Sequence, residues 1–245
     1  DLALFSAGAE VSRHFSPLAA KAGAAVVDNS PTFRMEPWVP LVVPEVNPDD
    51  LKGHRGIIAN PNCSTIQMVV ALYPLHKVNP IQRIVVATYQ SVSGAGAAAM
   101  EELTTQTKQI LEGHGATAHV YPHQIAFNLL PEIDVFLYNG YTKEEWKMLE
   151  ETRKIMHAPE LWVSATCVRV PVYIGHAEAV HVEFTRAMSP EDARTILAQA
   201  PGIRLLDDPD ISLYPMPWSV AGTDEVYVGR IRRDVSHPNG LVMWI

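Results

Sequence analysis

The stretch IIANPNCSTIQMVVALYPL, residues 57–75, places one of the chain's two cysteines between polar residues and directly ahead of a long apolar run. Asn62 is a favourable N-cap, because its side chain can accept a hydrogen bond from the free N–H groups of a first helical turn. Cys63 would then lie in that first turn. The apolar residues that follow recur at helical spacing and predict a buried helix: Ile66, Val69, Val70 and Leu72.

Two interpretations of Cys63 stay open on these residues alone. Free cysteine is among the most buried residue types, so Cys63 could simply pack in the core. Alternatively, the free N–H groups and the positive end of the helix dipole stabilise a thiolate, which lowers the thiol pKa from about 8.5 to ~7 or below. The position next to a capping residue favours the second interpretation, a nucleophile.

The sixty residues before this stretch predict an α/β unit. We expect short strands at Leu2–Phe5 and Ala24–Val27, with a helix over Ser12–Ala22 between them. A crossover of that length predicts parallel, right-handed pairing. The segment EPWVPLVVPEVNPDD, residues 36–50, carries four prolines and predicts loop and edge structure, since proline cannot donate to a strand ladder.

Longer helices alternate with strands after Cys63. Residues 84–90 alternate between two faces, and the helix after them carries Met100, Leu103, Thr107 and Ile110 on one stripe. Capping signals at Thr142 with Glu145, and at Ser189 with Pro190, predict two further helices. Residues 162–176 and 179–184 predict strands between them.

Composition narrows the classes of function. The 245 residues are 47% hydrophobic and carry a net charge of −8 without a basic stripe, which argues against a nucleic-acid partner. The longest apolar stretches are about ten residues, short of the ~20 needed to span a bilayer, so we expect no membrane partner. Two cysteines do not make a disulfide framework, and a reducing cytoplasm fits them best.

Several motifs in order resemble the aspartate-semialdehyde dehydrogenase family. NPNCST (60–65), TYQSVSGAG (88–96) and RVPVYIGHAEAV (169–180) carry the likeness, together with DNSPTFRMEPWVPLVVPEVN (28–47) and YNGYTKEEWKMLEETRKI (138–155). The resemblance implies NADPH-dependent reduction of L-aspartyl 4-phosphate through a cysteine thioester, or the reverse oxidation with phosphate. It places that reaction in the biosynthesis of lysine and diaminopimelate, methionine, threonine and isoleucine.

The resemblance also implies the fold. We expect part of a Rossmann-type dinucleotide-binding domain over residues 1–62. A glyceraldehyde-3-phosphate dehydrogenase-like catalytic and dimerisation domain, of α+β type, should follow over residues 63–234. Residues 235–245 should begin a segment that returns to the first domain.

Three residues take catalytic roles through the resemblance. Cys63 is the nucleophile, His176 the general acid/base, and Gln90 orients the acyl intermediate beside the cysteine. From the residues alone, a lone histidine after a strand is more often structural, and its role rests on lying close to Cys63. An amide such as Gln90 can donate and accept hydrogen bonds without changing charge.

Four charged residues are matched to the substrate in the same way. Arg169 holds the α-carboxylate, Arg34 and Lys147 hold the phosphate, and Glu144 meets the ammonium group. An arginine fork suits bidentate capture of a carboxylate. The alternative for Glu144 and Lys147 is a solvated helix face with Glu151 and Lys154, whose pairs contribute ~0.3 kcal/mol each.

The cofactor implied by the resemblance is NADP. Its expected contacts here are Ala7 and Gly8 in one turn and Ser93 and Gly94 in another, because glycine turns let a backbone approach a ligand. We expect the glycine-rich phosphate turn before Asp1 and a closing helix after Ile245, and this stretch alone to bind cofactor poorly. The histidines show no metal-ligand spacing, so no metal is expected.

Rival functions remain among related enzymes and outside them. Glyceraldehyde-3-phosphate dehydrogenases tend to carry a second cysteine where this chain has Gln67. Glutamyl-phosphate reductases favour tyrosine and proline where this chain has Ser64 and Thr65. Malonyl-CoA reductase is harder to exclude from these residues. A non-catalytic dimerisation module with a degenerate site is the alternative from another class. The resemblance implies a homodimer or homotetramer, and a small-molecule substrate.

Overall fold

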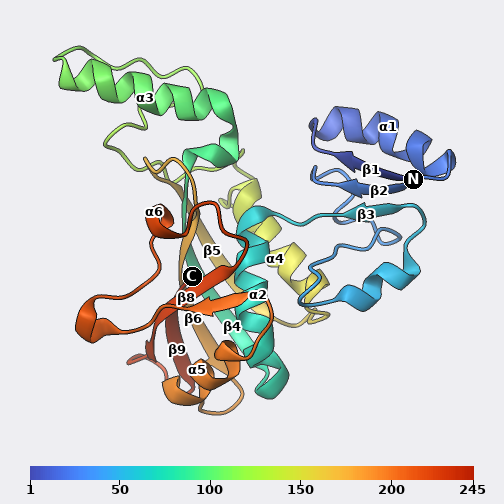
Figure 1. Ribbon diagram of the computed structural model, residues 1–245, viewed down its shortest axis with the longest axis vertical. Coiled ribbons are helices and arrows are strands. Elements are labelled where there is room, and N and C mark those ends of the chain that lie inside the picture. The colour runs from blue at the N-terminus through green and yellow to red at the C-terminus, as the bar shows by residue number, and fades with distance from the viewer.

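The computed structural model describes all 245 residues and contains two sheets joined by a buried helix (Figure 1). The first sheet is parallel, in the order β1-β2-β3. The predicted strand–helix–strand unit is confirmed, with the helix beginning three residues earlier than expected. Its elements are β1 (Leu2–Phe5), α1 (Ala9–Lys21), β2 (Ala25–Asp28) and β3 (Ile57–Ala59).

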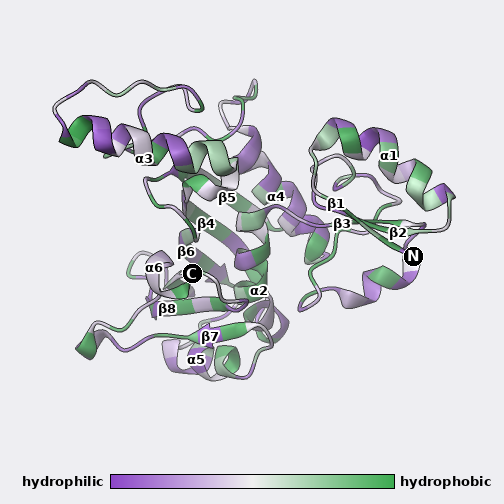
Figure 2. Cartoon of the chain, turned by 45° about the horizontal axis from the view of Figure 1, so that its top comes forward, coloured by the Kyte–Doolittle hydropathy of each residue, from purple (hydrophilic) through white to green (hydrophobic).

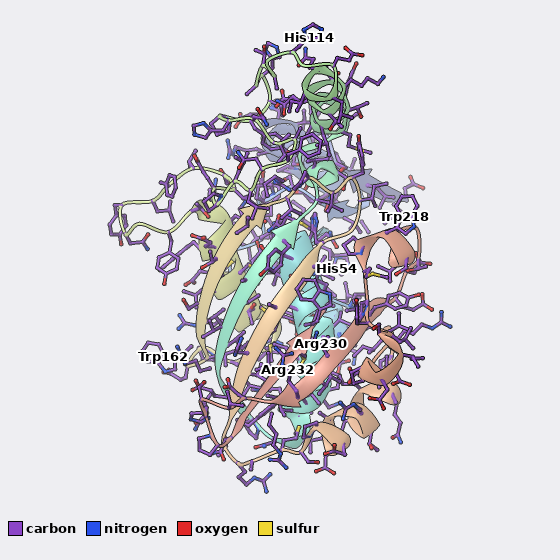
Figure 3. All side chains as sticks on the ribbon, turned by 90° about the vertical axis from the view of Figure 1, so that its left-hand side faces the viewer. His54, His114, Trp162, Trp218, Arg230 and Arg232 are labelled. Atoms are coloured by element: carbon purple, nitrogen blue, oxygen red, sulfur yellow. The ribbon has the colours of Figure 1, made fainter.

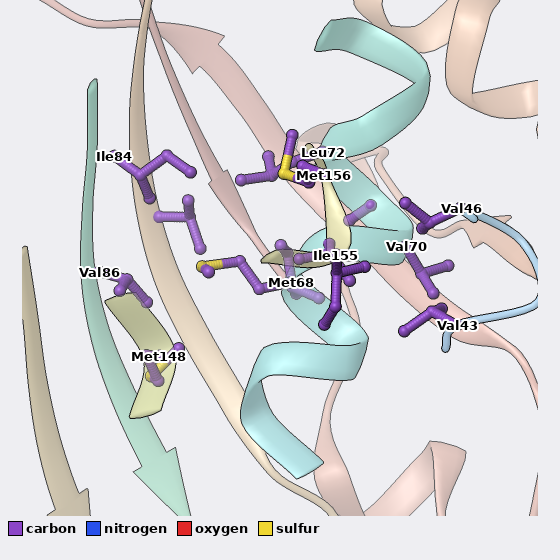
Figure 4. Packing of buried hydrophobic residues seen from close by; sticks show 14 of the residues in the cluster. Val43, Val46, Met68, Val70, Leu72, Ile84, Val86, Met148, Ile155 and Met156 are labelled. Carbon is purple, nitrogen blue, oxygen red and sulfur yellow. The ribbon is translucent and has the colours of Figure 1, made fainter. Parts of the chain in front are cut away.

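The proline-rich segment between β2 and β3 has little regular structure, as predicted. It contains a 3-10 helix, η1 (Pro48–Gly53), and a single bridge from Leu41 to Ala59. Its apolar side chains are nevertheless buried in the main core. Figure 4 shows Val43 and Val46 from this segment next to Val70 of the central helix. The segment therefore joins the first sheet to the second domain through apolar packing.

The second sheet has the order β5-β4-β6-β9-β8-β7. β4 and β5 run parallel, while β6 and β9 are antiparallel to their neighbours. The last strand, β9, lies inside this sheet between β6 and β8. The strands are β4 (Ile81–Gln90), β5 (Trp162–Arg169), β6 (Ala177–Phe184), β7 (Ile203–Leu205), β8 (Val226–Arg233) and β9 (Gly240–Trp244).

Three helices cover one face of the second sheet: α2 (Cys63–Val78), α4 (Lys143–Ile155) and α5 (Pro190–Ala198). The predicted caps at Asn62, Thr142 and Ser189 are all present. Figure 3 looks onto the opposite face, where no helix covers the strands and Trp162 and Arg232 are labelled. The remaining short helices are η2 (Val92–Ala95), η3 (Pro209–Ile211) and α6 (Pro217–Val220).

Helix α3 (Ala97–Leu111) projects away from both sheets (Figure 1). Its buried face differs from the prediction. Leu103 is buried as expected, but Glu102 and Gln106 are buried with it, whereas Thr107 and Ile110 are only partly covered. The two polar side chains bind the loop that follows α3, a contact for which helical periodicity gives no signal.

Candidate active site

A cavity of about 720 Å³ opens between the two sheets at the start of α2. It gathers nine of the eleven residues that the sequence predicted, from six separate stretches of the chain. Ala7 and Gly8 do not line it. The predicted residues in its wall are Arg34, Cys63, Gln90, Ser93, Gly94, Glu144, Lys147, Arg169 and His176.

Helix α4 holds the start of α2 in place. Figure 2 shows α4 as mostly hydrophilic, although it packs beside the apolar α2. Two of its carboxylates are buried against Asn62: the Asn62 backbone N–H donates to Glu151 Oε2 at 2.6 Å, and Nδ2 donates to Glu144 Oε1 at 2.8 Å. Asn62 Oδ1 in turn accepts from the N–H groups of Ser64 and Thr65, both at 3.1 Å. The turn that carries Cys63 is therefore fixed from both sides.

Cys63 is exposed to this cavity, as a nucleophile must be. Its thiol pKa is nevertheless raised, first by burial in the recess and then by the Glu144 carboxylate. The backbone N–H of Ser64 lowers the pKa, but by less. The prediction of a lowered pKa is therefore wrong for this structure, because desolvation and a nearby negative charge outweigh the helix start. Cys167 is fully buried, and burial raises its pKa to about 12.

His176 enters the cavity as a neutral imidazole. Burial and then the Arg169 charge lower its pKa to about 4. The backbone N–H of Ser91 donates to Nδ1 at 3.0 Å, which makes Nδ1 an acceptor and leaves the ring proton on Nε2. An imidazolium would place a second N–H against that of Ser91. In this geometry the ring offers the cavity a hydrogen-bond donor.

Gln90 ends β4 and is 1% exposed. Its Nε2 donates to Glu144 Oε1 at 3.2 Å and to Thr88 Oγ1 at 3.3 Å. Gln90 and Asn62 therefore share one acceptor, so the amide beside Cys63 and the helix cap are oriented by the same carboxylate. The orienting role implied for Gln90 stays a prediction.

Paired charges line one end of the cavity. Arg34 Nη1 lies 3.1 Å from Glu151 Oε1, and Lys147 Nζ lies 2.9 Å from Asp134 Oδ2 and 3.2 Å from Glu144 Oε2. Burial lowers the pKa of Lys147, but the two carboxylates outweigh burial and raise it, which keeps the ammonium charged. Buried charges are tolerated when they are paired in this way.

Sequence reasoning treated Glu151 as part of a solvated helix face and did not single out Asp134. Glu151 is fully buried and bonds both Arg34 and Asn62. Its spacing of four residues after Lys147 was a usable signal, since it lies on the same helix face. Nothing in the sequence pointed to Asp134, which adopts a positive φ of 66° in a loop.

Close packing favours glycine at position 94. A Cβ there would lie 3.0 Å from Arg169 Nη1 and 3.3 Å from His176 Cε1, so a larger residue would have to displace these side chains by a few tenths of an ångström. Arg169 itself donates from Nη1 to the Ser91 carbonyl at 2.8 Å. The turn, the arginine and the histidine are therefore one packed unit.

The residues present fit the nicotinamide end of a dinucleotide better than its phosphates. Ser93 and Gly94 line the cavity beside Cys63 and His176. Ala7 and Gly8 follow β1, and a chain of hydrogen bonds runs from Ser6 through Asn29 to Asn60 along the carboxyl ends of the first sheet. Ligands of open α/β sheets bind at this edge. No group of three or more His, Cys, Asp or Glu side chains is arranged to hold a metal ion.

Glu178 is a buried acid that sequence reasoning did not single out. It lies on β6 two residues after His176, is 0% exposed, and neither carboxyl oxygen has a hydrogen-bond partner. Burial raises its pKa well above the usual range, and Gln67 offsets only part of this. Burial therefore favours the protonated form of Glu178 over the charged form.

Two family models match the chain. The "Semialdehyde dehydrogenase, NAD binding domain" covers residues 1–54, and the "Semialdehyde dehydrogenase, dimerisation domain" covers residues 72–245. The first match lies on the parallel sheet and the second includes the whole six-stranded sheet. Both descriptions name the class of semialdehyde dehydrogenases.

Individual proteins similar to this chain identify its family within that class. The aspartate-semialdehyde dehydrogenase of Aquifex aeolicus is 57% identical over all of this chain and 73% of its own length, and that of Bacillus subtilis is 51% identical over all of this chain and 73% of its own. Aspartate semialdehyde dehydrogenase II from Vibrio cholerae, solved in complex with ASA, superposes with a TM-score of 0.97 at 50% identity, covering 99% of this chain and 72% of that one. A Candida albicans enzyme solved with NADP has a TM-score of 0.75 at 28% identity, covering 100% and 72%. This chain belongs to the aspartate-semialdehyde dehydrogenase family.

The raised pKa of Cys63 predicts how it reacts with iodoacetamide. Cys63 should be alkylated and Cys167 left unmodified, with a rate that keeps rising above the pH at which an ordinary thiol ionises. Glu144→Gln should move the rate profile to lower pH, because a negative charge beside the thiol is removed. Mass spectrometry of the modified peptides measures both. Identical pH profiles for the two proteins would contradict this account of the thiol.

The raised pKa of Glu178 predicts a pH-dependent stability difference. Its folded pKa is raised, so the unfolded chain releases this proton at lower pH than the folded chain, and stability is lost as pH rises above about 4.3. Glu178→Gln should therefore raise the free energy of unfolding more at pH 8 than at pH 5, measured by urea denaturation. The exposed Glu160→Gln is the matched control and should show no such difference.

Proposed function

We propose that the chain reduces L-aspartyl 4-phosphate to L-aspartate 4-semialdehyde and phosphate through a thioester on Cys63, and runs the reverse oxidation with phosphate. The observation that carries this proposal is the single cavity that joins a cysteine, a neutral imidazole and two groups of charged side chains. A small zwitterion with a phosphate needs charged contacts at two ends and a nucleophile between them.

Cys63 attacks the acyl carbonyl as a thiolate, the carbon–oxygen bond to phosphate breaks, and phosphate leaves toward Arg34 and Lys147. The resting thiol has a raised pKa, so its proton must leave during the reaction. Before the attack, a phosphate oxygen of the bound substrate accepts the thiol proton, so the leaving group departs as hydrogen phosphate. Paired cations at the exit stabilise its charge.

His176 donates a hydrogen bond from Nε2 to the carbonyl oxygen, on which negative charge grows during attack. A neutral donor suits this task because it needs no change of protonation. The bond from Ser91 to Nδ1 supports this tautomer. Gln90 holds the acyl group beside the cysteine.

The two charged groups on the α-carbon of the substrate are bound by side chains of opposite charge. Arg169 pairs with the α-carboxylate and Glu144 with the ammonium group. Glu144 Oε1 already accepts from Asn62 and Gln90, so its orientation is set before substrate binds. Preorganised contacts of this kind reduce the entropy that binding costs.

NADPH, when bound, supplies the hydride that reduces the thioester carbonyl. Ser93 and Gly94 would hold its nicotinamide end, and Ala7 and Gly8 would lie toward the rest of the dinucleotide. We place the NAD(P)-binding part in residues 1–62 and the catalytic and dimerisation part from residue 63 onward. A reducing cytoplasm suits an enzyme with a free nucleophilic thiol.

The uncovered face of the second sheet is the surface we propose for a homodimer, with a tetramer as a further assembly. Val85, Ala87, Tyr89, Ala179 and Trp244 give this face partly exposed apolar rows. No long helix covers this face of the sheet (Figure 3), although Trp244 Nε1 also donates to the Pro215 carbonyl just before α6. Exposed apolar surface of this kind marks a protein interface, and the matching family model is described as a dimerisation domain.

Substituting the nucleophile should affect the chemical step, whereas substituting the arginine proposed to bind the carboxylate should affect substrate binding. Cys63→Ala should reduce phosphate-dependent oxidation of aspartate semialdehyde by ~10⁴-fold or more, because no thioester forms. Arg169→Leu should raise KM for the semialdehyde and leave KM for phosphate unchanged. NADP reduction followed by absorbance measures both. Normal turnover by Cys63→Ala, or wild-type activity on malonyl-CoA in place of the semialdehyde, would overturn the proposed reaction.

The dimer proposal predicts the mass of the protein in solution. Light scattering should give at least twice the 27.0 kDa of one chain. Ala179→Glu should dissociate the assembly, because it places a charge in an apolar contact. Lys21→Glu, on the exposed end of α1, is the control and should keep the mass unchanged.

A further inference from the structure

An aromatic ring from the loop after α3 covers the guanidinium of Arg169. The Arg169 Cζ lies 5.9 Å from the centroid of the Tyr121 ring. The same ring packs against the small apolar cluster at the base of α3, while its buried hydroxyl has no hydrogen-bond partner. The ring of Tyr121, rather than its hydroxyl, makes the contact.

Two buried polar side chains of α3 hold this loop. Glu102 Oε2 accepts from the backbone N–H groups of His119 at 2.7 Å and Val120 at 2.6 Å, and Oε1 accepts from that of Tyr121 at 3.4 Å. Gln106, one turn later, accepts from the N–H of Ile125 at 2.9 Å. The backbone on both sides of the ring is therefore fixed to one helix.

Arg169 is held from its other sides as well. Its Nη1 donates to the Ser91 carbonyl, and its backbone pairs with Leu130 at the end of the same loop. Its Nε is buried and has no hydrogen-bond partner. The ring covers a face of the guanidinium and the Ser91 carbonyl occupies Nη1, so Nη2 is the donor left for a ligand in the cavity that Arg169 lines.

We propose that Tyr121 is a positioning residue for substrate: its ring orients Arg169 so that the free Nη2 of the guanidinium meets the substrate's α-carboxylate. This inference rests on the proposed function, in which Arg169 binds that carboxylate. Glu102 contributes by holding the loop that carries the ring. Tyr121 and Glu102 thus act on the cavity through Arg169, although neither of them lines it.

The physical basis is the attraction between a cation and an aromatic face, which is strong where both are desolvated. Arginine stacks on aromatic rings while keeping its donors free in the guanidinium plane. A ring therefore fixes the plane of Arg169 without competing for the donors that a carboxylate needs. Without the ring, ordering the side chain costs rotamer entropy at each binding event.

The test compares Tyr121→Leu with Tyr121→Phe in the full chain. Tyr121→Leu keeps an apolar side chain for the α3 cluster but removes the ring, and should raise KM for aspartate semialdehyde about tenfold, equivalent to about 1.4 kcal/mol. KM for phosphate should stay unchanged and kcat should stay within about twofold, because phosphate binds at the opposite end. Tyr121→Phe keeps the ring and should retain the wild-type KM.

A double-mutant cycle with Arg169→Lys separates positioning from a structural effect. If the ring acts through the guanidinium, Tyr121→Leu should raise KM for the semialdehyde in the wild-type background but not in the Arg169→Lys background. The same rise in both backgrounds, or an equal rise in both substrates' KM, would overturn the proposal. An unchanged KM in an active Tyr121→Leu variant would also overturn it. Because this stretch alone is expected to bind cofactor poorly, the assay uses the full-length protein, and an inactive full-length wild type would instead reject the proposed function.

Discussion

The buried contact between α4 and Asn62 is the interaction on which the site depends. Glu151 binds the Asn62 backbone and Glu144 binds its side chain, so two carboxylates of one helix fix the first turn of another. The same carboxylates pair with Arg34 and Lys147 and orient Gln90. Loss of either acid would leave buried donors and cations without partners, which costs more than one hydrogen bond.

This arrangement explains why Cys63 has a raised pKa when no substrate is bound. Glu144 stabilises the cations and the amides around it, but its charge opposes a thiolate. The helix start that favours the thiolate is the weaker influence in a recess shielded from water. Binding an ammonium group at Glu144 would offset that charge, so the substrate itself would favour ionisation of the nucleophile. Substrate binding would then precede ionisation of the Cys63 thiol.

Most of the residues that line the cavity were predicted from the sequence, but the side chains that support them were not. Cys63, His176, Arg169 and their partners were found because motifs in order resemble a known family, and the cavity brings these residues together. Asp134, Glu151 and Glu102 were not assigned roles, because a buried carboxylate is indistinguishable in sequence from a solvated one. The burial that decides its role comes from elements more than a dozen residues away.

The amino-acid sequence by itself determined the local elements of this protein: the capped helices at Asn62, Thr142 and Ser189, the parallel unit of β1, α1 and β2, and the loops rich in proline. These follow from short-range hydrogen bonding and from apolar periodicity. Only the tertiary structure decided the tautomer of His176, the raised pKa of Cys63 and the ring of Tyr121 over Arg169. Each of these depends on desolvation and on groups supplied by distant segments. The spacing of neighbouring residues encodes neither the desolvation nor those groups.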